Sequence, residues 1–229
     1  MAADDAVPSA DERAAGLAVG ILGGTGDQGR GLARRLAMAG HRVIIGSRDA
    51  ARAAAAAATV GSAPQVTGVS NEDAARAADV VIAAVPFAGH AALLARLAGP
   101  LAGKILIDCV NPMAFDQRGA YPIPVPEGSA AQQAAAVLPA SRVVGAFHHV
   151  SATLLLDPQV AGLDQDVLVL GDDREATDLV QALASRIPGM RGVYAGRLRN
   201  CGQVEALTAN LVSVNRRYKA HAGLRITDI

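Results

Sequence analysis

Short apolar runs alternate along the chain with longer segments in which apolar positions recur every three or four residues. The runs are typical of strands buried on both faces of a parallel sheet, and they occupy residues 19–22, 42–46, 65–69, 79–85, 104–108 and 142–147. The segments between them have the spacing of amphipathic helices, as Leu32 and Leu36 illustrate. This alternation predicts an α/β protein with a doubly wound parallel sheet and right-handed crossovers.

The first apolar run leads into a glycine-rich loop. Gly24, Gly26 and Gly29 have G-x-G-x-x-G spacing, and a helix is predicted to begin near Asp27. In this motif the glycines allow a tight turn, the approach of a pyrophosphate and close packing of the helix, whose free N–H groups face the anion. The strand, loop and helix together predict a Rossmann-type sheet that binds a dinucleotide.

The end of the second strand predicts which dinucleotide binds. An NAD site places an acidic residue there, but this chain has Ser47 and Arg48, with Arg52 one helical turn further on. A guanidinium group matches the geometry of phosphate oxygens, so these residues favour NADP with its 2′-phosphate. The alternative is a solvated strand end with surface arginines.

Two further segments are expected at the same edge of the sheet. Ala84, Val85 and Pro86 end the fourth apolar run and are predicted to border the nicotinamide ribose. His148 and His149 follow the sixth run, where they could bind an anionic oxygen, exchange a proton or complete a strand end. Neither has Cys, Asp or Glu at ligand spacing, so no metal site is predicted.

The chain is predicted to have three parts. Residues 1–16 are polar, acidic and alanine-rich, which is typical of a disordered N-terminal extension. Residues 17–165 are expected to form the NADP-binding Rossmann domain, and residues 166–229 a smaller C-terminal α/β lobe. Within the first domain, the proline-rich segment 111–128 is predicted to be an irregular loop over the strand ends. An amphipathic helix over 203–220 is expected either to pair in a homodimer or to pack inside the molecule.

Composition excludes several classes of protein. The chain has 229 residues, a hydrophobic content of 51 % and a formal net charge of zero, so nothing points to nucleic acid or an anionic membrane as a partner. Cys109 and Cys201 match no zinc or redox spacing, and the N-terminus lacks the basic start and apolar core of an export signal. The sequence therefore predicts a cytoplasmic protein with reduced cysteines.

Several segments resemble the coenzyme F420-dependent NADP oxidoreductases. The resemblance covers the chain from about Leu17 to Ile229, and it is carried by GGTGDQGRGLARRLA, GSR, NEDAARAADVVIAAVPF, the GDD before an acidic helix, and LRNCGQVEALTANLVSVNRRY. It implies reversible hydride transfer between reduced F420, an 8-hydroxy-5-deazaflavin, and NADP. Both cofactors carry the reactive carbons, so the protein has to hold nicotinamide C4 against deazaflavin C5 and exclude water.

The resemblance also implies roles for individual residues. It assigns the pyrophosphate to Thr25, Gly26, Asp27 and Gln28. It assigns the 2′-phosphate to Ser47, Arg48 and Arg52, in agreement with the interpretation above. It places Val150 and Ala152 beside the nicotinamide, His148 at the deazaflavin as the catalytic residue, and the lobe 166–229 over the F420 pocket. The phosphate and glutamate tail of F420 would meet basic residues among Arg197, Arg199, Arg216, Arg217 and Lys219.

Two alternatives share the glycine loop and the strand end. NADPH-dependent imine or pyrroline-carboxylate reductases have both features, but they use a long helical second domain, whereas one long helix is predicted after residue 200. A non-catalytic NADP(H)-binding regulator would need no second pocket. His149, for which the family pattern has no counterpart, leaves open which imidazole faces the deazaflavin.

Overall fold

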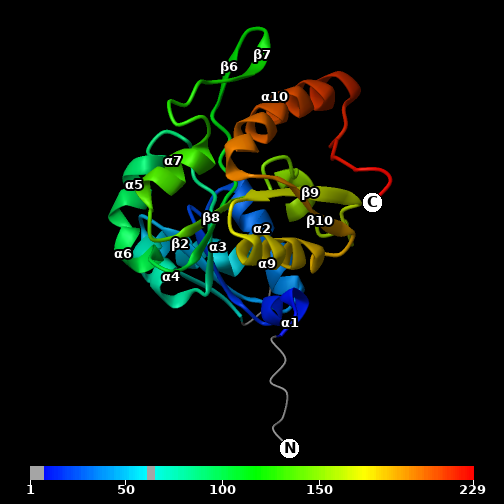
Figure 1. The fold of residues 1–229 in the computed structure, drawn as a ribbon. Helices are drawn as coiled ribbons and strands as arrows, with labels where there is room; N and C mark the ends of the chain where they lie inside the picture. The colour runs from blue at the N-terminus through cyan, green and yellow to red at the C-terminus, as the bar shows by residue number, and fades with distance from the viewer. Residues whose placement is uncertain (1–7, 61–64) are drawn as a thin grey trace, which may run out of the picture.

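A computed structural model describes residues 8–60 and 65–229 of the chain. Its centre is an eight-stranded sheet with helices on both faces (Figure 1). The strands, in spatial order, are β10 (Met190–Gly196), β9 (Gln165–Gly171), β8 (Arg142–Gly145), β5 (Ile105–Asp108), β4 (Val80–Ala83), β1 (Ala18–Leu22), β2 (Arg42–Ser47) and β3 (Val66–Ser70). From β8 to β3 all neighbours are parallel, and their order is that of a Rossmann sheet, which confirms the predicted fold class.

Apolar side chains alternate between the two faces of each central strand and build one core on each face. In β1, for example, Ile21 belongs to one core and Leu22 to the other. The first core is covered by α2 (Asp27–Met38), α3 (Ala50–Thr59), α8 (Ala152–Leu156) and α9 (Arg174–Ser185). The second is covered by α4 (Asn71–Ala77), α5 (His90–Arg96), α6 (Ala98–Leu101), α7 (Ala130–Val137), a 3-10 helix (Leu198–Asn200) and α10 (Cys201–Tyr218).

The C-terminal part of the chain extends the main sheet. The segment predicted to form a smaller α/β lobe from residue 166 consists of β9, α9, β10 and α10, and its two strands share a sheet with the strands that precede residue 146. β9 runs antiparallel to β8, with Val144 opposite Gly171 and Gly145 opposite Leu170. Because of this reversal, the first residues of β9 lie beyond the carboxyl end of β8.

Part of the predicted disordered extension is folded. Residues 1–7 lie outside the described part of the chain, but α1 (Ala10–Ala14) is a helix with a capping box between Ser9 and Glu12. Ala14 is fully buried, and Arg186 at the end of α9 donates a hydrogen bond to the Asp11 carbonyl. The prediction of disorder is therefore wrong for this turn, because capping and burial together offset the ordering entropy of a polar segment.

The loop predicted over 111–128 contains a hairpin. β6 (Met113–Asp116) pairs with β7 (Gly119–Pro122) antiparallel, and the hairpin stands out from the body of the molecule beside α10 (Figure 1). The Asp116 carboxylate accepts hydrogen bonds from the backbone N–H groups of Arg118 and Gly119, and Gly119 has a φ of 125°. The prolines of this segment indicated an irregular loop, but an Asp side chain and a glycine stabilise a tight turn within it.

Sequence patterns also missed the short helix α8. Its position depends on Arg35 of α2, which is 1 % exposed and whose guanidinium group donates to four carbonyl groups in and after that helix. These acceptors belong to Leu154, Leu155, Asp157 and Val160. A buried arginine that holds a segment more than a hundred residues away leaves no local signal in the sequence.

Candidate functional site

The glycine loop has the close packing that its motif predicts. A Cβ atom added to Gly29 would lie 2.6 Å from the Cα atom of Gly24, so the helix can approach the loop only with glycine there. Gly23 has a φ of 67°, and a Cβ atom on it would lie 2.5 Å from Val85 Cγ1. A Cβ atom added to Gly26, in contrast, would have no neighbour closer than 3.9 Å, so there is room beside Gly26 for an incoming group.

A groove of about 530 Å³ runs along the carboxyl ends of β1, β2 and β4. Eight of the predicted cofactor residues line it: Thr25, Gly26, Ser47, Arg48, Arg52, Ala84, Val85 and Pro86. Three segments distant in sequence therefore meet around one cavity, as the strand order requires.

The charge of this groove comes from arginines that have no acidic partner. The Asp49 carboxylate caps α3 by accepting from the N–H groups of Ala51 and Arg52, at 2.9 and 3.3 Å. Among residues 8–60 and 65–229, neither the Arg48 nor the Arg52 guanidinium group forms an ion pair. Both guanidinium groups can therefore bind an anion at the end of β2.

Sequence reasoning missed three polar residues of the groove: Asp49, described above, Asn71 and Arg96. Asn71 is 7 % exposed, and its Oδ1 atom accepts a hydrogen bond from Gly23 N at 3.2 Å, which ties the start of α4 to the glycine loop. Arg96 lines the groove from α5, on the same helical face as Ala92 and Leu93. The helical spacing of Arg96 from these two neighbours is a sequence signal that could have placed it in the groove. The contact between Asn71 and Gly23 spans 48 residues and leaves no such signal.

Comparison with known proteins identifies the family. The model of a family described as "NADP oxidoreductase coenzyme F420-dependent" matches residues 18–112. The F420-dependent NADP reductase of Methanothermobacter marburgensis is 40 % identical over 224 residues, which is 93 % of this chain and 99 % of that protein. The chain belongs to the F420-dependent NADP reductases. This membership confirms the resemblance and the predicted activity, an oxidoreductase that uses NADP and coenzyme F420.

Solved structures agree with this family. A structure from Arthrobacter sp. FB24, described as a candidate F420-dependent NADP reductase, is 30 % identical with a TM-score of 0.80 and covers 93 % of this chain and 100 % of that one. An imine reductase from Bacillus cereus is 16 % identical with a TM-score of 0.62, over 88 % of this chain and 63 % of that one. The second likeness shows the fold alone, so the imine reductase alternative gains no support over the F420-dependent NADP reductases.

The other predicted cofactor residues lie outside the lining of the groove. Gly24 and Gly29 are packed against each other, and Asp27 forms an ion pair with Arg30 at 2.6 Å. Gln28 donates from Nε2 to the Phe147 carbonyl at 3.3 Å, so the helix that begins at the glycine loop contacts the segment that follows β8. That segment carries the predicted nicotinamide neighbours Val150 and Ala152, whose roles in this F420-dependent NADP reductase remain predictions.

Residues 147–150 form a turn that several elements hold. Phe147 has a φ of 65°, a conformation that L side chains rarely adopt. The His148 carbonyl accepts from Asn111 Nδ2 at 2.8 Å and from Thr208 Oγ1 at 3.3 Å, and His149 Nε2 donates to the Asp166 carbonyl at 2.8 Å. The loop after β5, α10 and β9 thus fix the turn, together with Gln28 of α2.

The two histidines have different surroundings. His149 is engaged by the Asp166 carbonyl, whereas neither ring nitrogen of His148 has a hydrogen-bond partner within the described residues. His148 is 3 % exposed, and burial lowers its pKa to about 4. The imidazole that the family resemblance assigns to the deazaflavin is therefore neutral at neutral pH, and its catalytic role remains a prediction.

Asp108 and His90 form a buried polar pair that connects two segments of the site. Asp108 at the end of β5 and His90 at the start of α5 are fully buried, with Oδ2 and Nε2 2.7 Å apart. Burial is the largest single effect and lowers the pKa of His90, but the hydrogen bond to Asp108, the charge of that carboxylate, the hydrogen bond to Gln133 and the charge of Glu205 together raise the pKa above its ordinary value. Asp108 Oδ1 also accepts from Val110 N, so this pair connects α5, which lines the groove, with the loop that leads to Asn111.

Residues 8–60 and 65–229 contain neither a cluster of metal ligands nor a helix that could span a membrane. Within the described ranges, no three His, Cys, Asp or Glu side chains gather closely enough to hold a metal ion. No helix among those residues combines the length and apolarity needed to cross a bilayer.

Proposed function

We propose that hydride passes between NADP and coenzyme F420 at the carboxyl edge of the sheet, with NADP lying in the groove. The observation that carries this proposal is the pair Arg48 and Arg52, whose guanidinium groups have no acidic partner in the described structure and line the groove beside Ser47. These three residues bind the 2′-phosphate, because arginine and serine offer donors to phosphate oxygens.

The remainder of NADP follows the groove toward β4. The pyrophosphate lies at Thr25 and Gly26, where the missing side chain of Gly26 leaves room and the N-terminus of the 12-residue helix α2 provides N–H groups. The nicotinamide reaches Ala84, Val85 and Pro86 at the other end of the groove. From there it meets Val150 and Ala152, since Gln28 ties that turn to the same loop.

The deazaflavin of F420 is placed on the far side of the nicotinamide, by the turn that carries His148. The transferred hydride belongs to the two cofactors, so the protein contributes orientation and exclusion of water. Neutral His148 can donate or accept a hydrogen bond there without bringing a charge into a buried place.

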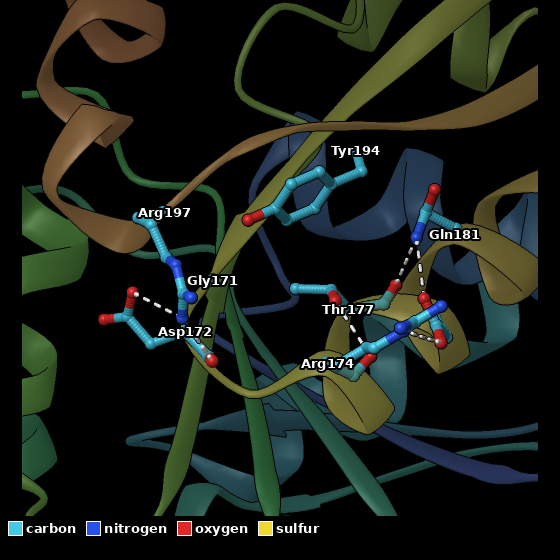
Figure 2. A pocket seen from close by; sticks show the side chains of 8 residues that line it. Gly171, Asp172, Arg174, Thr177, Gln181, Tyr194 and Arg197 are labelled. Atoms are coloured by element: carbon cyan, nitrogen blue, oxygen red, sulfur yellow. Dashed lines mark hydrogen bonds and ion pairs between the residues drawn. The ribbon is translucent and has the colours of Figure 1, made fainter.

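The acidic tail of F420 fits a groove of about 550 Å³ between the hairpin and α10. Phe115, Asp116 and Arg118 line it from the hairpin, and Val212, Arg216 and Arg217 line it from α10. Arg118 pairs with Asp116, whereas neither Arg216 nor Arg217 forms an ion pair within the described residues. A different pocket of about 450 Å³, between α9 and β10, is less suitable because its charged groups are already paired: Arg197 with Asp172, and Arg174 with Asp178 (Figure 2).

An absorbance assay tests the reaction. Purified protein is mixed with oxidised F420 and either NADPH or NADH, and the loss of the deazaflavin band is followed. We expect rapid loss with NADPH and little with NADH. Binding of NADPH without any loss of the band would instead favour imine reduction or a regulatory role.

A matched pair of variants tests the placement of the tail. Arg217→Glu should raise the KM for F420 while leaving the KM for NADPH unchanged, because a like charge would face the glutamate carboxylates. Arg174→Glu, in the pocket of Figure 2, serves as the control and should change neither KM. An equal rise in both variants would contradict the assignment.

The proposal includes a homodimer and a cytoplasmic location. Val214 and Tyr218 on α10 are 37 % and 73 % exposed, and Phe115 on the hairpin is 66 % exposed. Burial of this apolar surface against a second copy would stabilise it. Light scattering on a sizing column measures the mass directly, and a monomer at micromolar concentration would contradict the dimer. The cytoplasmic location agrees with Cys109 and Cys201, which are both free and buried.

A further inference from the structure

Asp166, at the start of β9, joins the C-terminal segment to the sheet. Its backbone N–H donates to the Leu224 carbonyl at 2.7 Å, and its Oδ2 atom accepts from Ile226 N at 2.6 Å. The side chain is fully buried and receives two hydrogen bonds from the Arg191 guanidinium group, at 2.9 and 2.8 Å. Arg191 also donates to the Ile226 carbonyl, so the segment after residue 221 is bound at several points.

The same residue supports the turn after β8. The Asp166 carbonyl accepts the hydrogen bond of His149 Nε2 at 2.8 Å. This contact exists because β9 is antiparallel to β8 and its first residues extend past the carboxyl end of that strand. Asp166 therefore connects the C-terminal segment on one side with residues 147–150 on the other.

The turn requires such support because its backbone is strained. Phe147 has a φ of 65° without being glycine, and a conformation of this kind persists only where the surroundings determine it. Gln28, Asn111 and Thr208 hold the carbonyls of Phe147 and His148. His149 is held through its side chain, and its one hydrogen-bonding partner among the described residues is Asp166.

We infer that Asp166 is a positioning residue for hydride transfer: it fastens the C-terminal segment and, through its carbonyl and His149, fixes the turn that presents Val150 to the nicotinamide. The inference rests on the proposed function, which places the two cofactors at this turn. Asp166 itself touches neither cofactor, and it acts by limiting the positions that the turn can take.

The test compares Asp166→Asn with Asp164→Asn. Asp164 lies two residues away and is 86 % exposed, and among the described residues it pairs with Arg225, which also donates to Asp166 Oδ1 at 3.3 Å. Asp164→Asn therefore removes a neighbouring charge but leaves the bonds from Arg191 and Ile226 N to Asp166 in place, which makes it a matched control. We expect Asp166→Asn to lower kcat about tenfold, because a small displacement of reacting groups has a large effect on rate, while the KM for NADPH stays within about twofold. Amide hydrogen exchange should rise both in 147–150 and in 222–226. Asp164→Asn should match the wild type in kcat and in the exchange of 147–150.

Two variants of His149 separate the turn from the C-terminal segment. His149→Leu removes the donor to Asp166, so exchange should rise in 147–150 but not in 222–226, and kcat should fall. His149→Gln keeps a hydrogen-bond donor at a similar distance from the backbone, so the exchange of 147–150 and kcat should both return toward the wild-type values. These variants keep the inference testable if Asp166→Asn fails to fold, which its thermal midpoint reports.

Two results would overturn the inference. One is a faster exchange of 222–226 in Asp166→Asn with unchanged exchange in 147–150. The other is a His149→Leu protein whose turn and kcat match the wild type. Should the wild type itself not oxidise or reduce F420, the proposed function fails, but the exchange data still decide whether Asp166 holds the turn.

Discussion

Gln28 Nε2 lies 3.3 Å from the carbonyl oxygen of Phe147 and donates a hydrogen bond to it. The glutamine belongs to the first turn of the helix after the glycine loop, and Phe147 begins the strained turn after β8. The loop expected to bind the pyrophosphate is therefore connected to the turn expected to contact the nicotinamide. A dinucleotide that contacts both the loop and the turn binds to two segments whose relative position is already fixed. Less conformational entropy of the protein is therefore lost on binding.

Reversing the charge of Arg48 tests the preference for NADP. Arg48→Glu should weaken NADPH binding by about tenfold to a hundredfold, since hydrogen bonds to a charged group contribute about 1.5–3 kcal/mol. NADH binding should change much less, because it has no 2′-phosphate. Titration calorimetry with both nucleotides measures the difference. Arg76→Glu, on an exposed residue paired with Glu72, is the control, and an equal loss for both nucleotides in Arg48→Glu would refute the phosphate assignment.

The parts of the site that the sequence predicts well are those encoded by local spacing. The glycines at 24, 26 and 29 and the residues Ser47, Arg48 and Arg52 lie within one β-α-β unit, so short-range patterns are sufficient to place them. The groove brings Gly26, Ser47, Arg48 and Arg52 together with Val85 and Pro86 because a Rossmann sheet sets strand order and direction.

The parts that were missed depend on contacts between distant residues. Nothing near Asn71 indicates that its side chain binds Gly23, and nothing near Asp166 indicates a bond from His149. The direction of β9 is another example: the segment after residue 150 turns through α8, which buried Arg35 holds in place, and the next strand returns antiparallel. Local periodicity specifies a strand but not its direction in the sheet.

Removing the charge of Asp108 should strongly destabilise the fold. The carboxylate and His90 are fully buried, and Asp108 helps to raise the pKa of His90, so Asp108→Asn removes the partner of a buried group; breaking a buried ion pair typically costs about 3–5 kcal/mol. Urea denaturation measures the loss. Asp178→Asn, which breaks an exposed pair with Arg174, should change the free energy of unfolding by less than about 1 kcal/mol. Similar values for the two variants would mean that the buried pair is not ionised.

Glu205 predicts a pH dependence of stability. Its carboxylate accepts hydrogen bonds from the N–H groups of Ala130 and Ala131, but burial dominates and raises its pKa to about 7 from an ordinary 4.5. Between those pH values the folded state binds a proton that the unfolded state has lost, so this residue makes the protein less stable as pH rises from about 4.5 to about 7. The effect levels off above that range.

A variant isolates the contribution of Glu205 from that of other groups. As pH rises from acidic to alkaline values, the wild type should lose about 3 kcal/mol of unfolding free energy relative to Glu205→Gln, which has no carboxyl group to titrate. The size follows because each unit of pKa corresponds to about 1.4 kcal/mol. Denaturation at several pH values provides the curve. Glu175→Gln, on the exposed start of α9, should show no such shift. A difference that does not vary with pH would show that Glu205 has an ordinary pKa.

The protonation state of His148 provides the last prediction. Because burial lowers its pKa to about 4, the imidazole should remain neutral across the range in which an ordinary histidine, with a pKa of about 6.5, gains its proton. NMR of the ring resonances, with His148 assigned by its loss in His148→Gln, should show no titration of this residue from about pH 6 to pH 8. The pH profile of kcat should likewise show no step near pH 6.5 that His148→Gln removes. If the ring titrates in that range, solvent reaches it in the free protein, and a charged imidazolium would then be available to the anionic oxygen of the deazaflavin.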